Sequence, residues 1–347
     1  MELKGLHHLT AVTGDPSVNV AFYTQVLGLR LVKKTVNQDD TSAYHLFYGD
    51  SLGRPGTEVT FFDWPHAGRA SRGTGVITAT ALRVPGQGAL EAWAQRLADF
   101  GVRHKGIREL GGRTTLEFAD PEGQRLRLVD GGQSPGSSPW PASPVPETMV
   151  IRGLHAVQLT VRQAAPTVRL LTDILGFREH GRYTSPEGSA VRMFEAGPGG
   201  PSTEVHLEER PDLGPGRVGI GGVHHVAFRT PDGAQQEAWR RRLAEAGVRI
   251  TPGHRPLLLP LHLLPGARRG ALRDRHGRAR LRHRRGRGSP GGKLGPAPLP
   301  GAPPRQHRGR PAADPASEDG AIGPGPAYLT TSTLRISSKP GPTTRTK

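Results

Sequence analysis

The chain has 347 residues, no cysteine and a formal net charge of +17. The absence of cysteine excludes disulfides, thiolate metal sites and cysteine nucleophiles. No apolar run is long enough to span a membrane and the N-terminus lacks an apolar signal segment, so we expect a cytoplasmic protein that does not bind membranes.

The positive charge lies almost entirely in the last part of the sequence. Residues 253–347 contain 19 Lys and Arg, 4 Asp and Glu and 15 prolines, but one Tyr and no Phe or Trp. Residues 1–252 carry the other 28 basic and 26 acidic residues and are nearly neutral. A segment with so few apolar side chains cannot offset the entropy of ordering its backbone. We therefore predict a folded part that ends near residue 252 and a disordered tail at 253–347.

Residues 1–252 contain four repeated units, which begin near residues 5, 75, 153 and 222. Each opens with alternating apolar residues, which predict a strand, and continues with an amphipathic helix that ends at a glycine. The opening strands read GLHHLTAV, VITATALRV, GLHAVQLTV and GVHHVAFRT, and the closing glycines are Gly28, Gly101, Gly176 and Gly247. Short strand patterns follow the first three helices. A Pro/Ser/Gly-rich stretch at 134–147 predicts a linker between two-unit domains at 1–133 and 148–252.

Two of the opening strands carry a pair of adjacent histidines. His7 and His8 lie in GLHHLTAVTGD, and His224 and His225 lie in GVHHVAFRTPD. In both, an aspartate in the position of a helix N-cap follows the second histidine at the same spacing. Imidazoles at equivalent places of two repeated units supply most of a metal site. Because neighbouring side chains of a strand point to opposite faces, we do not expect both histidines of one pair to be ordinary ligands.

A strand, a helix and three strands, repeated in pairs, resembles the vicinal oxygen chelate superfamily, in which βαβββ modules pair into a cupped sheet around a metal. The run HHLTAVTGDPSVNVAFYTQVLGLRLVKKTVNQDD, followed by YHLFYGDSLGRPGTEVTFFDWP, is similar to ring-cleaving dioxygenases of the hydroquinone type. The resemblance covers the chain up to about residue 252. It implies an α+β fold of four βαβββ modules in two cupped mixed sheets, with the fourth module truncated.

The resemblance also implies a metal site. In that family two His and one Glu hold one iron, and the His positions match His8 and His225. Such a set leaves open positions at which a diphenolate and O₂ bind side by side. His7 and His224 match histidines that lie beside the ligands and orient substrate or move protons. Fe(II) is therefore the expected cofactor, with Mn(II) or another divalent metal as the alternative.

Other polar side chains have simpler interpretations. Single histidines near strand starts, such as His155 and His206, are usually structural. Glu58 and Glu204 occupy matching positions in PGTEVTFF and PSTEVHLE, and solvent-facing strand positions explain them.

The glutamate ligand expected at the end of the fourth unit is missing. After VRITP the family continues with aromatic-rich strands, whereas this chain reads GHRPLLLPLHLLPGARRG. Permitted codons for His254 onward, read one base later, encode TDRFYFRSIYFREPGGVLFEIATDGPGF, which is similar to the family's end of that unit. We infer a one-base insertion near the codons of Pro252 and Gly253, with the glutamate codon spanning Arg273 and Asp274. Out-of-frame reading also explains the Arg-rich tail better than nonspecific binding to nucleic-acid phosphates.

Three classes of function remain. The first is cleavage of a hydroquinone or catechol ring with Fe(II) and O₂; the others are a glyoxalase-type metal-dependent lyase or isomerase and a non-catalytic aromatic-binding remnant. We expect a small aromatic diphenol and O₂ as partners and no specific nucleic acid, and a homo-oligomer is compatible with the sequence. Tyr44 and His45 are candidates for the pocket lining. If the chain is made as written, we expect poor iron binding, impaired activity and aggregation along an open sheet edge.

Overall fold

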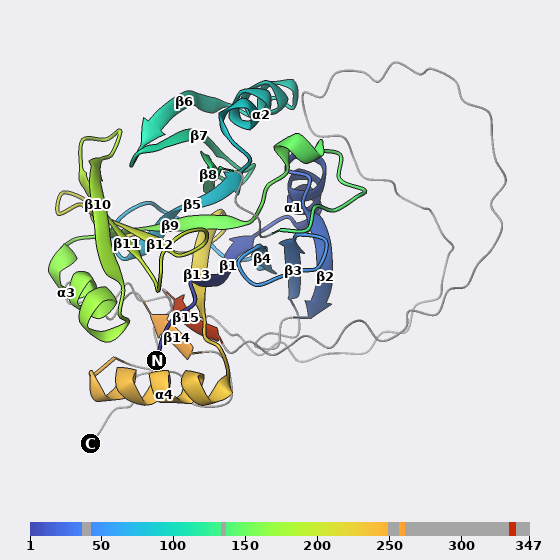
Figure 1. The fold of residues 1–347 in the computed structure, drawn as a ribbon. Helices are drawn as coiled ribbons and strands as arrows, with labels where there is room; N and C mark the ends of the chain where they lie inside the picture. Colours follow the sequence, from blue (N-terminus) through green and yellow to red (C-terminus); the bar gives the residue numbers. More distant parts are fainter. Residues whose placement is uncertain (37–42, 133–136, 249–256, 261–332, 338–347) are drawn as a thin grey trace, which may run out of the picture.

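The computed structural model describes residues 1–36, 43–132 and 137–248, together with the backbone of two short strands farther along the chain. These residues form a mixed α+β fold with two curled sheets and helices arranged around them (Figure 1). The first three modules follow the predicted order of a strand, a helix and three strands. The predicted fold class is therefore confirmed.

The elements have the following bounds. Module 1 contains β1 (Leu6–Thr13), α1 (Pro16–Ala21), β2 (Arg30–Val36), β3 (Tyr44–Gly49) and β4 (Glu58–Asp63). Module 2 contains β5 (Val76–Val84), α2 (Gln87–Asp99), β6 (His104–Leu110), β7 (Arg113–Ala119) and β8 (Arg125–Asp130). Module 3 contains β9 (Leu154–Val161), α3 (Ala164–Arg169), β10 (Arg178–Thr184), β11 (Ala190–Glu195) and β12 (Glu204–Glu209). Module 4 contains β13 (Gly222–Arg229) and α4 (Gly233–Glu245), and the short helical segments are η1 (Phe22–Val26), η2 (Glu147–Met149) and η3 (Leu170–Ile174).

Local sequence explains where the helices begin and end. The side chain of Asp15 accepts hydrogen bonds from the N–H groups of Ser17 and Val18 at the start of α1. Asp232 accepts one from the N–H of Gln235 in α4. Both aspartates therefore satisfy N–H groups that a helix start leaves unpaired. The four closing glycines all adopt positive φ, a conformation that costs little without a Cβ.

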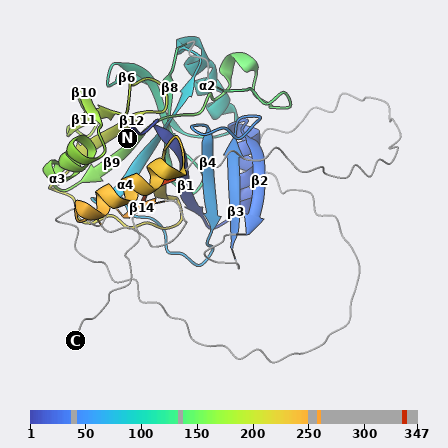
Figure 2. The same cartoon turned by 60° about the horizontal axis from the view of Figure 1, so that its bottom comes forward.

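The modules pair across the linker. β1 of module 1 pairs antiparallel with β13 of module 4, and β5 of module 2 pairs antiparallel with β9 of module 3. One sheet has the order β14-β15-β13-β1-β4-β3-β2, and the other has β10-β11-β12-β9-β5-β8-β7-β6. Figure 2 shows β2, β3 and β4 side by side in the first sheet, with α4 near the opposite end. Both sheets thus join the two halves of the chain, and the domain boundaries drawn at the linker stay a prediction.

The tail contributes two strands to the first sheet, β14 (Leu257–Pro260) and β15 (Thr333–Ser337). β15 pairs antiparallel with β13 and parallel with β14. The unpaired edge of β13 offers N–H and C=O groups to a segment extended beside it, and these two short segments pair there, so that edge is not open as expected. The rest of the predicted tail lies outside the described residues.

Two β-bulges interrupt the pairing of β1 with β13 at the paired histidines. The register skips His7 on β1 and His224 on β13. The pairing of β5 with β9 skips Thr78 and His155 at the equivalent places. A bulge leaves two residues of one strand opposite one residue of its partner and re-aims the local side chains. The two sheets therefore have β-bulges at equivalent positions, and the side chains at these positions determine what each sheet can bind.

Candidate metal centre

His8 and His225 come together where β1 pairs with β13. Their Nε2 atoms lie 3.4 Å apart, although the residues are 217 positions apart in the sequence. Both side chains are buried. Two nitrogens bound at about 2.1 Å to one metal ion lie roughly 3 to 3.4 Å from each other. The separation of these imidazoles therefore fits coordination of one cation.

His7 and His224 lie directly against this pair. Nδ1 of His7 is 3.0 Å from Nδ1 of His8, and Nδ1 of His224 is 2.8 Å from Nδ1 of His225. Strict alternation along a strand would have turned the two histidines of each pair to opposite faces. The bulges remove that alternation, so each buried imidazole has a neighbouring imidazole at its other ring nitrogen.

Glu58, at the start of β4, belongs to the same cluster. It pairs in parallel register with His8, and its Oε2 lies 3.8 Å from Nδ1 of His7. One ring nitrogen from each of the two histidines and one carboxylate oxygen all lie within 4.8 Å of one another. Burial raises the pKa of Glu58 to about 7, with a smaller contribution from the charge of Asp50 and an opposing one from Lys33.

The interpretation of Glu58 as solvent-facing is therefore wrong, because 12% of its side chain is exposed. The matching PGTEVTFF and PSTEVHLE segments identified Glu58 as a repeated position in the sequence. The sequence does not show the strand register that places Glu58 on β4 opposite His8 on β1.

Threonines connect the histidines to β3 and β4. Oγ1 of Thr10 lies 3.0 Å from Nε2 of His225 and 2.8 Å from Oγ1 of Thr60. Nε2 of His45 lies 2.9 Å from Oγ1 of Thr60. His45, one of the two pocket candidates, is thus part of the polar cluster, whereas Tyr44 is 45% exposed and lies under Lys34.

An aromatic wall formed by Phe62 and Trp64 stands beside the histidines. The two rings stack with their centroids 4.9 Å apart. The Phe62 ring lies 5.4 Å from that of His224 and 6.1 Å from that of His225, and Trp64 lies 5.5 Å from His224. Flat apolar faces next to buried imidazoles suit a small aromatic molecule.

The second sheet lacks histidines at the two positions that correspond to His8 and His225. Ala156 follows the bulged residue of β9, and Ala79 follows that of β5. Methyl side chains cannot coordinate a metal. Of these equivalent positions in the two described sheets, those in the first sheet therefore hold the imidazole pair.

Glu204 is the counterpart of Glu58 in the second sheet, since it pairs in parallel register with Ala156. Its Oε2 lies 3.0 Å from Nε2 of His206 and 3.4 Å from Nε2 of His155. Arg113 donates to its other oxygen at 3.2 Å. Burial opposes ionisation, but the two histidines hold the pKa of Glu204 well below its ordinary value. Like Glu58, it is not solvent-facing as predicted, and 3% of its side chain is exposed.

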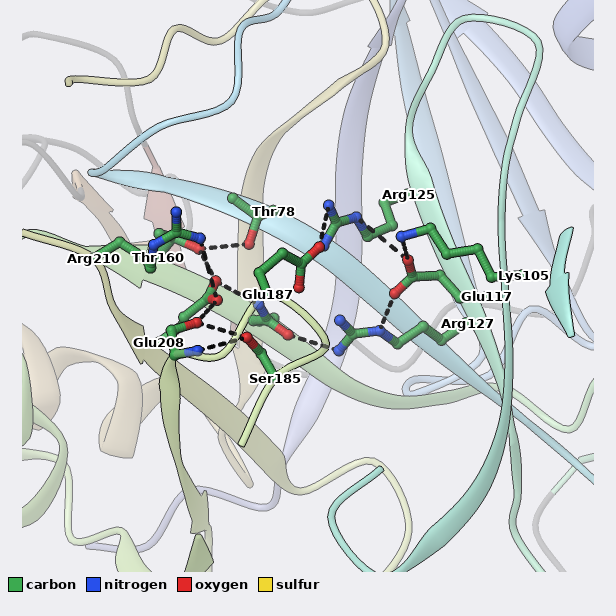
Figure 3. A network of polar contacts seen from close by, with 12 residues as sticks. Thr78, Lys105, Glu117, Arg125, Arg127, Thr160, Ser185, Glu187, Glu208 and Arg210 are labelled. Atoms are coloured by element: carbon green, nitrogen blue, oxygen red, sulfur yellow. Dashed lines mark hydrogen bonds and ion pairs between the residues drawn. The ribbon is translucent and has the colours of Figure 1, made fainter. Parts of the chain in front are cut away.

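A network of polar contacts links charged side chains along the second sheet (Figure 3). Glu117 accepts a hydrogen bond from Nε of Arg127 at 3.0 Å and pairs with Nζ of Lys105 at 2.6 Å. Arg127 also donates to Gln158 at 2.6 Å, and the amide of Gln158 donates to Glu208 at 2.8 Å. Burial raises the pKa of Glu117, but Lys105 and the arginines outweigh it and hold the value at about 2. These charges neutralise one another, so this network is structural.

Comparison with known proteins identifies the family. Residues 5–128 and 153–256 match the model of the Glyoxalase/Bleomycin resistance protein/Dioxygenase superfamily. The chain belongs to this superfamily. It is 47% identical over 249 residues to MhqA of Bacillus subtilis, which is named as a ring-cleaving dioxygenase, and the match covers 71% of this chain and 78% of that one. It is 32% identical over 239 residues to a protein of Sphingobium indicum named chlorohydroquinone/hydroquinone 1,2-dioxygenase, covering 66% and 71% of the two chains.

Solved structures agree with the fold. A Bacillus subtilis protein named as a dioxygenase superposes with a TM-score of 0.66 at 35% identity, covering 72% of this chain and 78% of that one. Glyoxalase I from Zea mays superposes with a TM-score of 0.55 at 18% identity, covering 73% and 84%, which shows a shared fold. In the described part of the chain, no helix is both long and apolar enough to cross a membrane.

Proposed function

We propose that this protein is a metal-dependent dioxygenase that cleaves the ring of a dihydroxylated aromatic, of the hydroquinone or catechol type. The observation that carries the proposal is the buried pair of Nε2 atoms, 3.4 Å apart, from modules 1 and 4. The aromatic wall beside this pair and relatives named for ring cleavage support the same reading.

The donor atoms fit a divalent cation of the non-haem type. Nε2 of His8 and Nε2 of His225 would hold the ion, and Fe(II), with Mn(II) as the alternative, would supply a path for electrons between a diphenolate and O₂. The third ligand that the resemblance implies is the glutamate whose codon would span Arg273 and Asp274. That part of the chain lies outside the described residues.

The adjacent histidines set which nitrogen each ligand presents. A neutral imidazole has one N–H and one lone pair. When Nδ1–H of His8 donates to Nδ1 of His7, the lone pair of His8 is on Nε2. The same arrangement holds for His225 and His224, and Oγ1 of Thr10 lies 3.0 Å from Nε2 of His225. We therefore assign His7 and His224 as positioning residues that fix the tautomers of His8 and His225.

The test compares the chain as written with a frame-corrected chain. Each is loaded with Fe(II) without oxygen, and O₂ uptake is then followed with hydroquinone and with catechol. We expect turnover in the corrected chain, its loss in His225→Ala and its retention in His155→Ala, which changes the bulged histidine of the other sheet. The chain as written should show weak turnover or none.

No O₂ uptake by the corrected chain with either substrate contradicts the proposal. Thiol-dependent conversion of methylglyoxal without O₂ uptake favours the isomerase class instead. Sequencing the gene tests the frame change separately, because the shifted frame must encode the aromatic strands. A cytoplasmic location and a homo-oligomer stay predictions.

A further inference from the structure

His8 can serve two different cation positions, one on each side of its ring. Its Nε2 faces Nε2 of His225 at 3.4 Å, whereas its Nδ1 faces Nδ1 of His7 at 3.0 Å. A neutral imidazole has one lone-pair nitrogen, so His8 serves one position at a time. The ligands available on each side decide which position is preferred.

The two sides offer different donor sets among the described residues. On the His225 side the described protein donors are two imidazoles and the neutral hydroxyl of Thr10. On the Glu58 side they are His7, His8 and a carboxylate, with the Oε2 of Glu58 3.8 Å from Nδ1 of His7 and all three donors within 4.8 Å. Ligand atoms bound at about 2.1 Å lie about 3 Å apart in adjacent positions and about 4.2 Å apart in opposite ones. Two imidazoles and one carboxylate on one face are a set that suits Fe(II).

The Glu58 carboxylate has weaker charge compensation than its counterpart in the second sheet, with Lys33 as the cation that acts on it. Glu204 has the guanidinium of Arg113 at 3.2 Å and two histidines within 3.4 Å. Within the described ranges, Glu58 has no ion pair as close as these, and its nearest is His7 at 3.8 Å. A nearly buried carboxylate with no close ion pair is costly, and a cation bound directly to it offsets that cost.

We propose that the chain as written binds one divalent cation through Nδ1 of His7, Nδ1 of His8 and the carboxylate of Glu58. Poor iron binding was expected because only His8 and His225 were available as ligands in the chain as written. Glu58 provides a further ligand, a carboxylate close to His7 and His8. The inference concerns the same metal region as the proposed function but does not depend on turnover. In the frame-corrected chain, the restored glutamate returns the cation to the side of His225.

The test is an anaerobic titration of the chain as written with Co(II), followed by its visible absorption and by equilibrium dialysis. Glu58→Gln should raise the Kd by about tenfold or more, and Glu58→Asp, which keeps a carboxylate, should recover part of the affinity. Glu204→Gln, at the matching position of the second sheet, should leave the Kd within a factor of about three, and His225→Ala should raise the Kd less than Glu58→Gln does. Circular dichroism checks that every variant is folded.

Several results overturn the inference. They are no Co(II) binding by the unsubstituted chain, unchanged affinity in Glu58→Gln, or an equal loss of affinity in His225→Ala and Glu58→Gln. In the frame-corrected chain the order should reverse, with His225→Ala costing more affinity than Glu58→Gln. A corrected chain that binds Co(II) but consumes no O₂ contradicts the proposed function and leaves the cation site standing.

Discussion

Replacing Glu117 by Gln should destabilise the protein in a way that depends on pH. Its side chain is 2% exposed, between Arg127 and Lys105. The folded protein holds the pKa of Glu117 at about 2, against an ordinary value of 4.5. Because the folded-state pKa is lowered, the ionised carboxylate stabilises the protein above pH 4.5, and this stability is lost as pH falls through 2.

The magnitude follows from the size of that shift. At about 1.4 kcal/mol for each pKa unit, the ionised carboxylate contributes about 3 kcal/mol at pH 7. The contribution falls to about 2 kcal/mol at pH 3.5, where the unfolded chain already binds the proton.

Urea unfolding of the metal-free protein at both pH values measures this effect. At pH 7 we expect the free energy of unfolding of Glu117→Gln to be about 3 kcal/mol below that of the unsubstituted protein. At pH 3.5 this gap between the two proteins should be about 1 kcal/mol smaller. Glu58→Gln is the matched control, because the folded protein raises the pKa of Glu58, and it should lose no stability at pH 7. A gap at pH 7 below about 1 kcal/mol, or one that is equal at both pH values, would refute the view that the second sheet is held by an internal ion network.

Three further changes test other parts of the structure. Trp239→Ala removes a fully buried side chain of α4 and should lower the free energy of unfolding by about 3 to 5 kcal/mol in urea titrations; a loss below 1 kcal/mol would mean that α4 does not pack as described. Gly153→Ala should lower the thermal midpoint, since Gly153 has φ +114° and a Cβ there would lie 2.6 Å from the carbonyl oxygen of Gly56; an unchanged midpoint contradicts this close approach. In the frame-corrected chain, Phe62→Leu should raise KM for hydroquinone by about tenfold with a smaller change in kcat, and an unchanged KM removes the aromatic wall from substrate binding.

The sequence alone determined the module pattern and the family. Alternating strands, capped helices and closing glycines are local signals, so they predicted a strand and a helix in each module without tertiary information. The two His-His pairs also pointed to His8 and His225, because each pair recurs at the same place in a repeated unit. The break in composition near residue 252 was visible for the same reason.

Tertiary structure alone decided how these residues meet. The pairing of module 1 with module 4, the bulges at His7 and His224 and the position of Glu58 all depend on strand register. Register is set by partners far away in the sequence, and a one-residue bulge reverses the direction expected from simple alternation. This is why the sequence placed the two histidines of each pair on opposite faces and Glu58 in solvent, whereas the folded chain gathers them into one cluster.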